Sequence, residues 1–85
     1  MIDLKTASTI AIEFIQNIYP QNADFQVEEI ETTEDGKYWL ITVGMYDSSE
    51  MKTPLGVLGN KPRKYKTVQI NKKNGEVRSM KIRKV

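Results

Sequence analysis

The stretch "YWLITVGMY" (residues 38–46) decides the fold, because it is the strongest strand signal in the chain. β-Branched and aromatic residues dominate it, as is typical of strands. Apolar side chains occupy both alternating sets of positions, namely Trp39, Ile41, Val43 and Met45 on one side and Tyr38, Leu40 and Tyr46 on the other. A strand that is apolar on both sides is usually covered on both faces. We therefore expect residues 38–46 to lie in the middle of a sheet.

Three further strands are expected around this one, over about residues 25–31, 63–71 and 76–84. The segment "FQVEEIE" (25–31) alternates until Ile30 breaks the pattern, so either a bulge between Glu28 and Glu29 restores the alternation or the strand ends there. Asp35-Gly36 is the strongest turn signal before the central strand.

The segment "QINKKNGEVRSMKIRKV" (69–85) predicts a hairpin that turns at Asn74-Gly75. A two-residue loop would place Val68 opposite Lys81, which pairs an apolar residue with a charged one across the strands. A three-residue loop over 73–75, with Gly75 left-handed, places Lys72 opposite Glu76 and Val68 opposite Met80. We favour the three-residue loop. It puts Ile70, Met80 and Ile82 on one inward-facing side.

A helix is expected before the strands, over about residues 4–18, with Asp3 or Thr6 as its N-cap. Its apolar stripe repeats at helical spacing: Leu4, Ala7, Ile10, Ala11, Phe14, Ile15 and Ile18. Pro20 follows and ends it. The fold class is therefore α+β, a single domain over residues 1–85 with the order α-β-β-β-β and the helix across one face of the antiparallel sheet.

The composition excludes much chemistry, since the chain has neither cysteine nor histidine. No thiolate metal site, no imidazole base and no His ligand is available. The acidic cluster at 28–35 lacks the spacing of a calcium loop and reads better as a charged edge strand. We therefore expect no catalytic residue, no metal and no cofactor, and a chain that is not an enzyme.

Residues 47–62 form a long connection with an apolar centre. Together with the second side of the central strand it defines a candidate surface for a protein partner or a second copy of the chain. The candidate protein-contact residues are Tyr38, Leu40, Tyr46, Leu55, Val57 and Leu58.

Charge is distributed unevenly along the chain. Residues 1–60 carry three lysines against ten acids, whereas residues 61–85 carry ten Lys or Arg against one acid. Strand parity places Lys64 and Lys66 on the inner side. It places the candidate basic face on the outer side, at Arg63, Tyr65, Lys81 and Arg83. This face suggests nucleic-acid binding as an alternative function. A second interpretation is that these cations complement the acids of the first two strands.

The segment "YKTVQINKKNGEVRSMKI" resembles the terminal hairpin of PepSY-like domains. The likeness is carried by Tyr65, Val68, Ile70, Gly75, Glu76 and Val77, with Asn71 and Asn74 where that family usually shows Asp and Thr. The preceding helix and the strand with Trp39 are similar in order and spacing, and the overall shape is similar to cystatin-like folds. The resemblance implies an inhibitory or binding role. The Gln-x-Val-x-Gly loop of cystatin-type inhibitors is absent from this sequence.

No signal peptide or membrane-spanning segment is indicated, because Asp3 and polar residues interrupt the N-terminal segment. We expect a cytoplasmic protein without a membrane partner.

Overall fold

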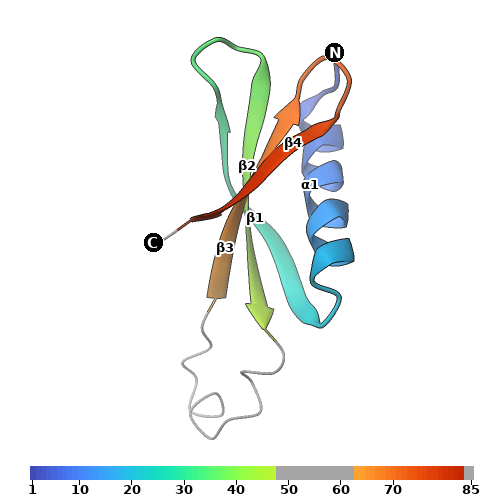
Figure 1. The fold of residues 1–85 in the computed structure, drawn as a ribbon, viewed down its shortest axis with the longest axis vertical. Helices are drawn as coiled ribbons and strands as arrows, with labels where there is room; N and C mark the ends of the chain where they lie inside the picture. The colour runs from blue at the N-terminus through green and yellow to red at the C-terminus, as the bar shows by residue number, and fades with distance from the viewer. Residues whose placement is uncertain (48–62, 84–85) are drawn as a thin grey trace, which may run out of the picture.

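The computed structural model, which describes residues 1–47 and 63–83, has one helix followed by four antiparallel strands (Figure 1). The elements are α1 (Leu4–Ile18), β1 (Asn22–Thr32), β2 (Tyr38–Asp47), β3 (Arg63–Asn71) and β4 (Val77–Arg83). Each strand pairs with the next, and the sheet order is β1-β2-β3-β4. The predicted fold class is confirmed, with β2 in the middle of the sheet and β1 and β4 at its edges.

Helix α1 has a capping residue at its N-terminus and buries a narrow stripe of apolar side chains. The Asp3 carboxylate accepts a hydrogen bond from the Thr6 backbone N–H at 2.8 Å, so Asp3 is the cap. Ala7, Ala11 and Ile15 are fully buried. The helix covers one side of the sheet, mainly over β1 and β2. No helix in the described part of the chain is long and apolar enough to cross a membrane.

Two residues of the predicted helix stripe are exposed, and two more, Ile10 and Phe14, are half-buried. Leu4 and Ile18 are 38% and 44% exposed. They are the first and last residues of α1, so they extend past the ends of the buried stripe.

The core lies between α1 and the inner sides of β2 and β3. Its fully buried strand residues are Ile41, Val43, Met45, Val68 and Ile70. The absence of large side chains at Ala7 and Ala11 leaves room for these residues beneath the helix. Lys66 lies on the same side, as predicted, and is almost fully buried, with its Nζ 5.5 Å from the centroid of the Tyr19 ring.

Of the two alternatives that the sequence left open for β1, a bulge or the end of the strand, the structure shows the bulge. The register with β2 shifts between Val27 and Glu29, which returns Ile30 to the inner side opposite Ile41. A second irregularity lies between Ala23 and Gln26 and was not predicted.

The β3–β4 hairpin has the predicted register along most of its length. Val68 lies opposite Met80, and Gly75 is left-handed with a φ of 77°. The prediction of a three-residue loop is wrong, because the Asn71 N–H donates to the Glu76 carbonyl at 2.8 Å. Asn71, rather than Lys72, therefore faces Glu76, and the loop spans residues 72–75.

The Asn71 side chain explains the longer loop. Its Oδ1 accepts hydrogen bonds from the backbone N–H groups of Lys73 at 2.8 Å and Asn74 at 3.3 Å. A register shift between Gln69 and Ile70 then restores the pairing.

Ile82 is on the predicted inward-facing side of β4, but its side chain is 72% exposed. A helix is about 10 Å wide and strands lie about 4.8 Å apart. One helix therefore covers about two strands, and the end of β4 lies beyond α1.

The turn between β1 and β2 is built around Asp35, as predicted. Its Oδ1 accepts hydrogen bonds from the Thr33 hydroxyl at 2.6 Å and the Lys37 N–H at 3.0 Å. Thr33 in turn accepts from the Tyr38 N–H at 3.2 Å. Gly36 takes the left-handed conformation that follows, with a φ of 73°. The hydrogen bond from Thr33, and then that from Lys37, lower the pKa of Asp35.

We expect the stability that Asp35 contributes to depend on pH. Because its folded pKa lies below the ordinary value of 3.8, this stabilisation is present above 3.8 and is lost as pH falls through the folded pKa. Asp35→Asn keeps the acceptor oxygen without the charge. Urea unfolding should find this variant less stable than the wild type near neutral pH, with the difference shrinking in acid. A difference that is the same at both pH values would contradict a role for the charge.

Candidate protein interface on the outer face of the sheet

The sheet has an outer face, opposite α1, defined by Tyr38, Leu40, Thr42, Gly44 and Tyr46 of β2 and the residues level with them on the other strands. Their neighbours along β2 point into the core, so alternation turns these five away from the helix. The predicted contact residues Tyr38, Leu40 and Tyr46 are thus brought together on this face, where each is half-buried. The other three, Leu55, Val57 and Leu58, lie outside the described residues.

The predicted basic face occupies the same surface. Arg63 lies opposite Tyr46, Tyr65 opposite Gly44, and Arg83 opposite Tyr65 on the far strand. Lys81 is opposite Thr67 and is exposed. Aromatic and cationic residues are therefore interleaved rather than separated into two patches.

Arg63 reaches across β2 to the acidic strand β1. Its Nη1 is 3.2 Å from Asp24 Oδ2, and its Nη2 is 3.2 Å from Glu28 Oε1 and 3.3 Å from the Asp24 carbonyl oxygen. Its guanidinium carbon also lies 4.5 Å from the centroid of the Tyr46 ring. Only 16% of the Arg63 side chain is exposed, so these contacts hold it against the sheet.

Gly44 makes this crossing possible. A Cβ at position 44 would lie 2.8 Å from Arg63 Nη2, 3.0 Å from Arg63 Nε and 3.1 Å from Glu28 Cγ. A side chain there would force the guanidinium of Arg63 to shift from this position. A glycine inside a strand often marks such a close approach, so this residue was a signal that the sequence interpretation missed.

The environment of Arg63 favours its charged form. Burial alone would lower its pKa, but hydrogen bonds with Tyr46 and Asp24 outweigh burial, with the charge of Glu28 adding to them, so the pKa of Arg63 is raised. It remains a fixed cation on this face.

Arg83 makes a similar contact from the other edge. Its Nη1 is 2.6 Å from Glu29 Oε2 and 3.3 Å from the Thr42 hydroxyl oxygen. That hydroxyl is 2.9 Å from the one of Thr67, so two threonines form a polar centre between the arginines. The interpretation that cations of β3 and β4 complement acids of β1 is therefore confirmed for Arg63 and Arg83.

A third arginine, Arg78, was not predicted as part of the site. Its guanidinium carbon lies 4.8 Å from the centroid of the Tyr38 ring. Two of the three tyrosines on the outer face that the structure describes are thus each accompanied by an arginine.

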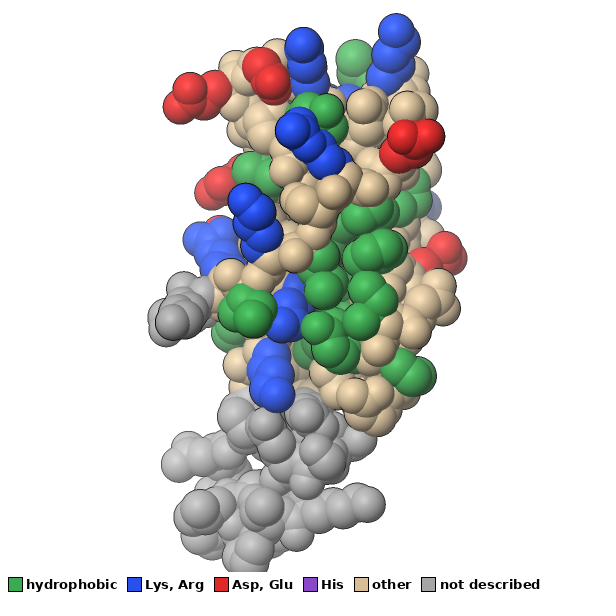
Figure 2. Space-filling model, in the orientation of Figure 1, with side chains coloured by type: hydrophobic (Ala, Val, Ile, Leu, Met, Phe, Trp, Pro, Cys, Tyr) green, Lys and Arg blue, Asp and Glu red, His purple; other side chains and the backbone are tan. Residues whose placement is uncertain are grey.

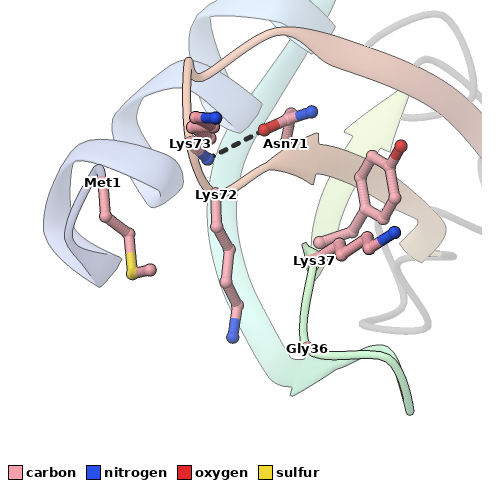
Figure 3. Close-up of a pocket in the computed structure, with 7 residues that line it drawn as sticks. Met1, Gly36, Lys37, Asn71, Lys72 and Lys73 are labelled. Atoms are coloured by element: carbon pink, nitrogen blue, oxygen red, sulfur yellow. Dashed lines mark hydrogen bonds between the residues drawn. The ribbon is translucent and has the colours of Figure 1, made fainter.

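Three lysines, Lys37, Lys72 and Lys73, lie instead at the end of the sheet near the two turns, around an open pocket of about 510 Å³ (Figure 3). It is lined by Met1, Gly36, Lys37, Tyr38, Asn71, Lys72 and Lys73. Lys72 is already engaged, since its Nζ lies 4.3 Å from the Trp39 ring centroid and 3.3 Å from the Thr32 hydroxyl. The side chains of Lys37 and Lys72 point in different directions, so the two cations do not converge on one ligand atom.

The part of the chain that the structure describes holds no group of three or more acidic residues arranged to bind a metal ion. No family model, curated protein or solved structure matches the chain.

Proposed function

We propose that this chain is a small non-catalytic domain that binds a protein partner, or a second copy of itself, through the outer face. The carrying observation is the pairing of half-buried tyrosines with arginines on a sheet face that α1 leaves uncovered. Arg63 lies over Tyr46 and Arg78 over Tyr38. Tyrosine and arginine are enriched among the residues that contribute most binding energy at protein interfaces.

The fixed positions of these side chains add to this support. Immobilising a long side chain on binding costs entropy, and Arg63 and Arg83 are already held by hydrogen bonds and ion pairs. A partner that contacts them therefore meets a surface that is largely pre-organised.

The carboxylates support a non-catalytic role. Asp24, Glu28 and Glu29 accept hydrogen bonds or ion pairs from arginines, a role that stabilises the sheet. Without histidine or cysteine in the chain, the remaining general bases are few.

Nucleic-acid binding is less well supported. Two of the four residues of the predicted basic face, Arg63 and Arg83, have carboxylate partners. Their charge is locally neutralised, which reduces the number of cations that would release counterions from a phosphate backbone.

A capture experiment tests the proposal. The tagged wild type, the double variant Leu40→Lys/Tyr65→Lys and the helix control Gln16→Lys are each used as bait in lysate of the source cells. Proteins captured by wild type and control but lost with the double variant are purified and titrated directly, and sedimentation of the three chains reports self-association.

Identical capture and sedimentation for all three chains would contradict the proposal that the outer face is a binding surface. Salt-sensitive binding of oligonucleotides would favour the alternative.

A further inference from the structure

Strand β4 leaves one backbone edge unpaired among the described residues. It is last in the sheet order, and its partner β3 occupies only one of its two sides. From Ser79 to Arg83 its register with β3 is regular. Such an edge presents a row of N–H and C=O groups that an extended chain can pair with.

The two sides of this edge differ in chemistry. Met80 and Ile82 lie on the helix side, with Met80 half-buried and Ile82 72% exposed. Lys81 and Arg83 lie on the outer face. The edge therefore alternates between apolar and cationic side chains.

The apolar side continues toward the helix. Ile10 of α1 lies beside the turn that precedes β4, because a Cβ on Gly75 would lie 3.2 Å from Ile10 Cδ1. Phe14, one helical turn further on, is on the same side of α1. Figure 2 shows apolar side chains gathered in a band between α1 and β4. An added strand with apolar residues on this side would extend that band.

The positive charge of β4 determines which kind of strand can pair with its edge. Strand β4, with the sequence VRSMKIR, contains three cations and no acid. Pairing with a second β4 would place like charges near one another, which destabilises a cross-strand pair. The acidic strand β1 of a second copy is a poor match, since its register is irregular at two places and its Glu28 and Glu29 already bind Arg63 and Arg83.

We propose that the β4 edge binds an extended segment of another protein in which acidic and apolar residues alternate. An acidic residue of that segment lies opposite the exposed Lys81, and apolar residues lie opposite Met80 and Ile82, while Arg83 stays paired with Glu29. The segment becomes a fifth strand. This inference rests on the edge of the sheet, and it stands or fails independently of the outer tyrosines.

The probe is an acetylated and amidated eight-residue peptide of alternating Glu and Val. An alternating Lys-Val peptide is the charge control, and a Glu-Val peptide with alternate backbone nitrogens methylated on its pairing edge is the hydrogen-bond control. We expect amide chemical shifts to change around Ser79–Arg83 with the Glu-Val peptide, and both controls to bind at least about 10-fold more weakly.

Two variants show whether the peptide contacts the β4 edge or the outer face. Lys81→Glu should weaken Glu-Val binding about 3- to 10-fold and strengthen Lys-Val binding, because it reverses one cross-strand charge pair. Leu40→Lys/Tyr65→Lys, which tests the outer face, should leave Glu-Val binding at Ser79–Arg83 in place. This separates failure of the edge from failure of the outer face.

Three outcomes would overturn the proposal. The first is no shift change with the Glu-Val peptide at millimolar concentration. The second is equal binding of the Glu-Val peptide and either control. The third is a wild-type dimer, seen by sedimentation, that Ile82→Lys dissociates, which would assign the edge to a second copy of the chain.

Discussion

Ile41→Ala should lower the free energy of unfolding by about 2–5 kcal/mol, the usual cost of truncating a buried isoleucine. Ile41 is fully buried in the central strand, between Ile30 on β1 and Val68 on β3. The neighbouring strands are fixed by hydrogen bonds and cannot close the cavity completely. Because domains of this size are stable by only about 5–15 kcal/mol, the variant should be markedly easier to unfold with urea.

Ile82→Ala is the matched control, because it removes the same atoms from a side chain that is 72% exposed. We expect a change within about 0.5 kcal/mol, as for most surface substitutions. If both variants lost similar stability, Ile82 would be buried in solution, by self-association or by another part of the chain, and the free β4 edge would be contradicted.

Arg63→Ala should cost about 1–3 kcal/mol, the largest effect that we expect on the outer face. The change removes hydrogen bonds to Asp24 and Glu28 and uncovers Tyr46. The two carboxylates are 48% and 33% exposed, so water replaces part of what they lose. The cost is therefore smaller than for a fully buried ion pair. Urea unfolding at low and high salt measures it.

Arg63→Lys separates charge from shape. A lysine keeps the charge but cannot place two nitrogens on two carboxylates at once. We expect it to recover less than half of the loss caused by Arg63→Ala. Full recovery would mean that the net charge of the strand, rather than the bridging geometry, stabilises this face.

Periodicity alone predicted most of this architecture, because burial imposes it on the sequence. Alternation in residues 38–46 separated the core side from the outer side, and the break at Ile30 marked an irregularity that proved to be the bulge of β1. Alternation alone could not predict that Ile82 is exposed. The width of one helix, rather than the side of the strand, decides whether the fourth strand is covered.

Less of the candidate site than of the fold could be predicted from the sequence. Parity placed Tyr46 and Arg63 on one face, but a long connection does not fix register in the way a tight turn does. The contacts of Arg63 with Asp24 and Glu28 depend on that register and join positions 39 and 35 residues apart. The loop at 72–75 depends on the Asn71 side chain, which an argument from apolar pairing does not consider.

The bare backbone at Gly44 links the side chains of three strands, because Arg63 of β3 lies over it on β2 and reaches Glu28 of β1. Glycine inside a strand is unfavourable by itself, so at this position its benefit depends on the arginine at position 63, whose guanidinium lies over it. In a homologue without that arginine, the constraint on position 44 disappears and a β-branched residue becomes advantageous. Substitutions at these two positions should therefore be non-additive: a side chain at position 44 should cost less stability in an Arg63→Ala background than in the wild type.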